Sequence, residues 1–181
     1  MEQKSFPELV FTDRHEARLK NAGQNVYLCV TQGDEGHRLT TKTLQADSLS
    51  DPELVFSLFY YTDAEADETK MVLPVHHSTN VCLSMDDDKT LKISSLRELP
   101  LLTNEVVPVE DPERLTIADN RFFYLKTSGS LVALEAMNGL HRDQFLALTS
   151  SNDVTIKDQS GGAVYADNVL FSLDDYSVTK L

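Results

Sequence analysis

The feature that most constrains the fold of this chain is a strand-and-hairpin unit that occurs three times. The copy between Asn120 and Lys157 opens with the run RFFYLK and closes with the run FLALTSSNDVTI. The opening run has counterparts in LVFSLFY at 54–60 and VLFSL at 169–173, with a shared F-x-L core. The closing run has counterparts in VCLSMDDDKTLKI at 81–93 and, with a longer turn, in VYLCVTQGDEGHRL at 26–39. A unit of about 50 residues that cannot bury its own apolar face is stabilised by packing against its copies.

Apolar and polar residues alternate within each unit, which predicts half-buried strands. Four strands in each of three units predict an all-β protein, a β-trefoil of twelve strands with pseudo-threefold symmetry, in which three hairpins cap a barrel. The expected strands cover residues 15–20, 26–31, 38–44, 54–61, 70–75, 80–84, 89–94, 121–127, 131–135, 145–149, 153–157 and 168–173. The expected core consists of Phe56, Phe123, Phe171, Leu58, Leu125, Leu173, Leu28, Leu83 and Leu146.

The length and composition indicate one folded domain. At 181 residues the chain is long enough for a single core, and its few Gly and Pro residues are scattered. We expect a partly flexible amino-terminal segment over residues 1–23 and the β-trefoil domain over residues 24–181. The net charge of −13 argues against binding of nucleic acid or heparin, which requires clustered Lys and Arg. An acidic surface favours solubility and faster encounter with a basic partner.

No apolar run approaches the roughly 18–20 residues of a membrane span, so no membrane association is expected. The start MEQKSFPELVF lacks the apolar region of a signal peptide, so we expect a chain without a secretion signal. The two cysteines, Cys29 and Cys82, are too few for a disulfide scaffold. Because each adjoins a leucine of an expected hairpin, both should be reduced and buried.

Catalytic and metal-binding patterns are missing from the sequence. His76 and His77 should point to opposite faces of a strand, so they are not expected to bind one metal ion. The run Asp86–Asp88 lacks the Gly and Glu of a calcium-binding loop and is typical of a turn. No nucleophile motif or phosphate-binding loop is present. We therefore expect no enzyme activity and no cofactor, and we expect function to depend on surface recognition.

Several segments, in their order, resemble the interleukin-1 cytokine family. The run ELVFSLFYYTDAEADETKMVLPV at 53–75 is similar to that family's fourth strand, acidic hairpin and fifth strand, and it is followed by NVCLS at 80–84 and DDKTL at 87–91. Later segments that resemble the family are RFFY at 121–124, LEA at 134–136, FLALT at 145–149 and NVLFSL at 168–173. The resemblance covers residues 26–173. The family's F-x-S-x-x-x-P signature is replaced at 134–136, which leaves the interleukin-1β, interleukin-18 and interleukin-33 branches open.

The resemblance implies a cytokine that leaves the cytoplasm without a signal peptide and acts outside the cell. Such a ligand is monomeric before it assembles primary and accessory immunoglobulin-domain receptor chains and triggers inflammatory or immune signalling. The alternatives are a trefoil protease inhibitor and a receptor antagonist of the same fold. A trefoil lectin with Q-x-W repeats is disfavoured because the chain has no Trp, and a heparin-binding growth factor is disfavoured because the chain is acidic.

The resemblance also implies which residues contact receptor. They lie in the segment near the first strands, after the third strand, in the acidic hairpin, in the strand 121–127 and in the loop 158–167: Arg18, Lys20, Gln45, Asp63, Glu65, Asp67, Glu68, Lys70, Lys126, Asp158 and Gln159. Removal of an amino-terminal propiece after an aspartate is a further expectation from the family. Asp13 is the candidate cleavage position.

Overall fold

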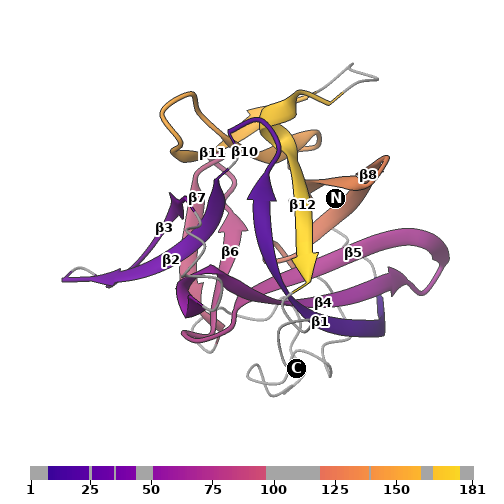
Figure 1. Cartoon of the computed structure of the whole chain (residues 1–181). Helices are drawn as coiled ribbons and strands as arrows, with labels where there is room; N and C mark the ends of the chain where they lie inside the picture. The colour runs from indigo at the N-terminus through magenta and orange to yellow at the C-terminus, as the bar shows by residue number, and fades with distance from the viewer. Residues whose placement is uncertain are drawn as a thin grey trace.

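Twelve strands form the fold in the computed structural model of the chain, which describes residues 8–24, 26–34, 36–43, 51–96, 119–138, 140–159 and 165–175 (Figure 1). In chain order they are β1 (Leu9–Asn21), β2 (Tyr27–Gly33), β3 (Gly36–Lys42), β4 (Val55–Asp63), β5 (Ala66–His76), β6 (Val81–Met85), β7 (Leu91–Ser95), β8 (Phe123–Ser128), β9 (Leu131–Ala136), β10 (Gln144–Leu148), β11 (Val154–Asp158) and β12 (Leu170–Asp175). Short 3-10 turns, η2 (Pro52–Leu54) and η5 (Asp167–Val169), precede β4 and β12. Each expected strand overlaps an observed one.

Six strands make the barrel and six make the cap. Strands β1, β4, β5, β8, β9 and β12 are connected by antiparallel pairing, while the hairpins β2–β3, β6–β7 and β10–β11 branch from β1, β5 and β9. The three branch points are the pairs Lys20/Tyr27, Val75/Cys82 and Glu135/Phe145. These positions are therefore equivalent in the three repeats, and the predicted β-trefoil is confirmed.

Two cap hairpins have the same turn, as the repeat predicts. In β6–β7 the amide of Asp86 donates to the carbonyl of Thr90, and in β10–β11 the amide of Thr149 donates to that of Asp153. The fourth residue of each turn, Lys89 or Asn152, has a positive φ near 65°. The β2–β3 turn, predicted to be longer, is instead shorter, because pairing continues to Gly33 and Gly36. Gly36 has a φ of 109°, which suits glycine.

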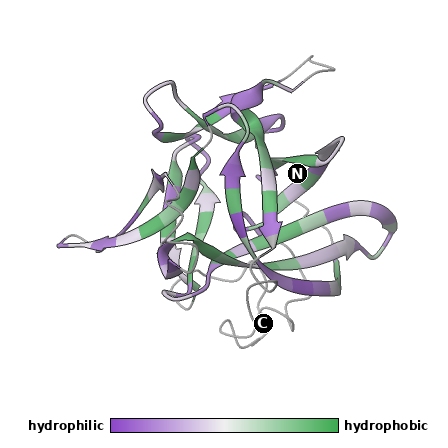
Figure 2. Cartoon of the chain, viewed as in Figure 1, coloured by the Kyte–Doolittle hydropathy of each residue, from purple (hydrophilic) through white to green (hydrophobic). Residues whose placement is uncertain are grey.

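The main core lies inside the barrel and under the cap. All nine predicted core residues belong to it, and of these only Leu125 and Leu173 are partly rather than fully buried. Every barrel strand contributes to the lining of the axis, where a void of only about 10 Å³ remains. That is about the smallest space that holds one water molecule. Figure 2 shows apolar residues along the barrel strands and polar residues at the exposed hairpin ends.

The structure corrects two details of the sequence analysis and confirms a third. β1 begins at Leu9, so most of the segment 1–23 belongs to the sheet, where it pairs with β4 and β12. The middle of β4 is buried on both faces rather than one, because Phe122, Met137 and Leu96 belong to a second apolar cluster with Phe59 of β4. The two cysteines are buried and free as predicted, but they lie in two different clusters.

Candidate recognition surface

The β4–β5 hairpin gathers the acidic residues that the sequence analysis selected. It extends beyond the barrel on the right of Figure 1. Glu65, Asp67, Glu68 and Lys70 are exposed, while Asp63 is half-buried. The Asp63 carboxylate accepts a hydrogen bond from the Glu65 amide at 2.9 Å, which stabilises the turn. Five of the predicted contact residues therefore share one projecting element.

Next to the base of this hairpin, a buried carboxylate organises two cations. Glu135 of β9 is 1% exposed. It accepts hydrogen bonds from Arg142 Nε at 3.1 Å and from the Asp143 amide at 2.8 Å, and Lys126 Nζ lies 3.9 Å away. The hydrogen bond that Arg142 donates to Glu135 raises the pKa of the guanidinium, and the negative charge of Glu135 acts in the same direction. A buried carboxylate held in this way fixes the positions of Lys126 and Arg142 at the surface.

Tyr124 connects the two features. Its ring centroid lies 5.5 Å from Lys126 Nζ and 5.1 Å from the Arg142 guanidinium, within the range of cation–π attraction. Burial raises the pKa of the Tyr124 phenol, and Asp63 contributes in the same direction. Tyr124 also pairs with Met71 of β5. We call the hairpin residues together with Tyr124, Lys126 and Arg142 the recognition surface.

Asp158 and Gln159 lie at the far edge of the same region. Asp158 pairs with Gln144, two residues after Arg142, and the Gln159 amide donates to the carbonyl of Asp143 at 2.9 Å. The Gln159 side chain accepts a hydrogen bond from the Ala166 amide at 2.9 Å, so its oxygen already supports the loop that leads to η5. Asp158 is exposed.

Arg18 and Lys20 lie on another part of the barrel. Both are on β1, where they pair with Asp174 and Ser172 of β12. The Tyr27 hydroxyl donates to the Asp174 carboxylate at 2.8 Å, and Lys20 Nζ lies 6.0 Å from the Tyr27 ring centroid. Arg18 is only 8% exposed, so Lys20 offers the larger surface to a partner.

The remaining predicted residues are Gln45 and Asp13. Gln45 lies outside the described residues. Asp13 is exposed at an irregularity of β1, where its carboxylate accepts from the Arg14 amide at 2.7 Å. Cleavage after Asp13 would remove Leu9, which is buried in the second apolar cluster. Processing at Asp13 stays a prediction, and it would remove the packing of Leu9 in the second apolar cluster.

The histidine pair lies at the end of β5 and just beyond it. His76 is buried, with its ring nitrogens 2.6 Å from Thr79 Oγ1 and 3.0 Å from the Glu53 carbonyl, and burial lowers its pKa. His77 is exposed, as expected for the opposite face. Its Nδ1 lies 2.8 Å from Ser57 Oγ and 3.9 Å from a Glu16 oxygen.

Ser57, His77 and Glu16 do not form a nucleophile relay of the Ser-His-acid type. Such a relay uses both ring nitrogens of the histidine, whereas here Nδ1 of His77 lies near both Ser57 and Glu16. Within the described residues, no group of three or more His, Cys, Asp and Glu side chains is arranged to hold a metal ion. The same residues include no helix that is long and apolar enough to cross a bilayer.

The sequence analysis did not identify three residues of the network around Glu135 and Tyr124: Tyr124, Glu135 and Arg142. One signal was present, since Glu135 is the only charged residue in the otherwise apolar run LVALEA. A charged residue in such a strand requires a partner. The partners are seven residues later in the chain and on the preceding strand, so the sequence did not identify them.

No protein-family model and no curated protein matches this chain. Its structure is similar to that of the designed threefold-symmetric protein ThreeFoil, with 16% identity, a TM-score of 0.53 and coverage of 88% of this chain and 98% of that one. It is also similar to the BEL β-trefoil, with 10% identity, a TM-score of 0.55 and coverage of 89% and 92%. The Rhizoctonia solani agglutinin has 12% identity, a TM-score of 0.50 and coverage of 92% and 98%. At these identities the similarity shows the fold alone: the protein is a β-trefoil.

Proposed function

We propose that this β-trefoil is an extracellular signalling ligand of the interleukin-1 type, which binds and assembles immunoglobulin-domain receptors. The order of the resembling segments supports the proposal, because each one falls on the corresponding element. The VFS run lies on β4, the acidic run on the β4–β5 hairpin, NVCLS at the start of β6 and DDK in the β6–β7 turn. In this proposal the ligand acts outside the cell and has no catalytic role.

The observation that carries the proposal is the composition of the recognition surface. Protein interfaces derive most of their affinity from a few Tyr, Trp and Arg residues, which are surrounded by a polar rim. Here Tyr124 lies against Arg142, and the buried Glu135 holds Arg142 in place. A preorganised side chain loses less conformational entropy on binding.

The acids of the β4–β5 hairpin have a different role in the proposal. Glu65, Asp67 and Glu68 are exposed, so they contribute to long-range attraction more than to contact energy. They increase the rate of encounter with a receptor that presents basic residues, and salt weakens this effect.

Surface plasmon resonance with interleukin-1-receptor-family ectodomains tests the proposal. The triple variant Glu65→Ser, Asp67→Ser, Glu68→Ser should associate more slowly and with a flatter salt dependence, at an unchanged melting temperature. Asp63 is kept because its carboxylate stabilises the hairpin turn. The matched control replaces three exposed acids of other elements, Asp34, Asp153 and Asp167, by Ser.

Two single variants test the contact role. Arg142→Ala should accelerate dissociation by about tenfold or more, which corresponds to a loss of about 1.4 kcal/mol. Gln45→Ala tests the segment after β3. Failure of every receptor ectodomain to bind, or equal behaviour of the test and control triples, would overturn the proposal.

Two further binding assays with this protein separate the alternative functions, a receptor antagonist and a protease inhibitor. A receptor antagonist binds the primary receptor chain but does not recruit the accessory chain. A trefoil protease inhibitor instead titrates a trypsin-like protease at a one-to-one ratio.

A further inference from the structure

The three cap hairpins enclose a hollow of about 220 Å³ between their outer strands. Strands β3, β7 and β11 line it, and each is hydrogen bonded to a single neighbouring strand. The hollow is on the cap and not on the β4–β5 hairpin, so it is independent of the recognition surface. Because it occurs where three repeats meet, no single repeat predicts it.

One part of the lining is apolar. Leu39, Leu91, Ile93 and Val154 are half-buried, with one side packed on the main core. Their remaining exposed surface faces water in the hollow. A ligand that covers these side chains removes apolar surface from water, which favours binding.

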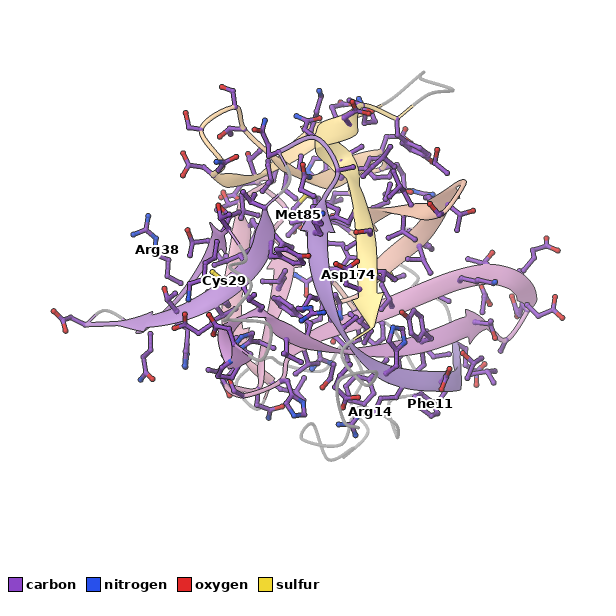
Figure 3. All side chains as sticks on the ribbon, in the orientation of Figure 1. Phe11, Arg14, Cys29, Arg38, Met85 and Asp174 are labelled. Carbon is purple, nitrogen blue, oxygen red and sulfur yellow. The ribbon has the colours of Figure 1, made fainter. Side chains whose placement is uncertain are left out.

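The other part of the lining is basic. It consists of His37, Arg38 and Lys92, in a chain with a net charge of −13. Lys92 is already paired with Asp86 at 2.6 Å. The Arg38 side chain is exposed and extends away from β3 (Figure 3), and among the described residues this side chain has no hydrogen-bond or ion-pair partner. The cation that is free to meet an anion is therefore Arg38.

We propose that this hollow binds a small amphipathic carboxylate, with the carboxylate on Arg38 and an aliphatic body on the apolar lining. A guanidinium donates two parallel hydrogen bonds to a carboxylate, which makes Arg38 selective for that headgroup. The volume of 220 Å³ holds about seven water-sized groups at about 30 Å³ each, which matches a six-carbon chain with its headgroup. The hollow is smaller than the roughly 300–1,000 Å³ of a typical drug-sized pocket, so the ligand is small and its affinity is millimolar.

A chemical-shift titration of the ¹⁵N-labelled protein with sodium hexanoate tests the site. The ionic strength is held constant, and hexanol, which has the same chain without the charge, is the comparison ligand. We expect saturable shifts confined to amides of β3, β7 and Val154. Hexanol should bind about fivefold more weakly, the factor that corresponds to about 1 kcal/mol for a solvent-exposed charge pair.

Arg38→Gln should weaken hexanoate binding by the same factor, about fivefold, and leave hexanol binding unchanged. Arg14→Gln is the matched control, because Arg14 is an exposed arginine of β1 that is absent from the lining of the hollow. Localised shifts with this pattern of variants would support the proposal. Absent or delocalised shifts, equal binding of hexanol, or equal binding by the two variants would overturn it.

Discussion

A buried ion pair at the start of β8 provides the sharpest test of how the fold is stabilised. The Arg121 side chain is fully buried and that of Asp119 is 3% exposed. Asp119 Oδ1 accepts hydrogen bonds from the Arg121 amide at 2.9 Å and from its Nε at 2.8 Å, and Oδ2 lies 2.5 Å from Nη2. The Asp119 carbonyl also accepts from the Phe122 amide at 3.2 Å, so the pair and the turn form one unit.

Substitutions of Asp119 and Arg121 should lower the free energy of unfolding by different amounts when made singly and together. Asp119→Asn keeps an oxygen for the Arg121 amide but leaves the guanidinium buried without its counter-charge, which costs about 3–5 kcal/mol. Arg121→Met leaves a buried carboxylate and costs a similar amount, about 3–5 kcal/mol. The double variant buries no charge and keeps the turn hydrogen bond, so it should cost about 1 kcal/mol or less. The contrast arises because an unpaired buried charge is less stable than an apolar side chain of similar volume.

Urea unfolding followed by circular dichroism measures these differences. With a slope of about 2 kcal/mol per molar urea, each single variant should lower the midpoint by about 1.5–2.5 M. The comparison is Lys42→Met, which removes a half-exposed cation 2.8 Å from Asp51 and 2.6 Å from Glu53 and should cost about 0–1 kcal/mol. If the single variants cost less than Lys42→Met, or if the double variant costs the sum of the singles, the reasoning is wrong.

Three further predictions concern the core, a phenol and the thiols. Phe123→Ala should lower the free energy of unfolding by about 3–5 kcal/mol, and a loss below about 1 kcal/mol in chemical denaturation would contradict its place in the core. Burial and the hydrogen bond to Asp174 raise the pKa of Tyr27 to about 12, so the free energy of unfolding should fall between about pH 10 and 12. Chemical denaturation across that range should show a smaller fall for Tyr27→Phe. Burial raises the pKa of Cys29 to about 11 and that of Cys82 to about 12, so a thiol reagent at neutral pH should label both only after unfolding; labelling of the native protein, or a bridge seen by non-reducing mass spectrometry, would refute this.

The sequence predicted the features that the three repeats share. The F-x-L cores and the hairpin leucines identified strands and core positions because apolar residues recur there with period two. The turns of β6–β7 and β10–β11 were also visible, since their polar residues occupy equivalent places. Boundaries were less accurate, as with β1, because the polar run at 13–16 interrupts the apolar pattern while the backbone there still pairs with β4.

Apart from the charged residue in LVALEA, the ion-pair network of Glu135 beneath the recognition surface gave no sequence signal, for the complementary reason. Lys20, Val75 and Glu135 occupy equivalent branch points of the three repeats, each paired with the first or second residue of a cap hairpin. The backbone requirement is the same at all three positions, but the side chains are a cation, an aliphatic group and a buried carboxylate. A comparison of repeats detects the residues that the repeats share, so it does not identify side chains that differ between them.

Under the proposed function, the differences at the branch points determine which part of the barrel wall contacts a partner. Val75 belongs to the second apolar cluster, so its repeat contributes packing there and no charge. Glu135 has the reverse role, since it is buried and holds Arg142 and Lys126 beside Tyr124. The threefold repeat produces three equivalent branch points. At one of them, the Glu135 carboxylate holds charged side chains in fixed positions at the surface. The Arg142→Ala and Glu65, Asp67, Glu68 variants therefore probe the departure from symmetry and not the fold itself.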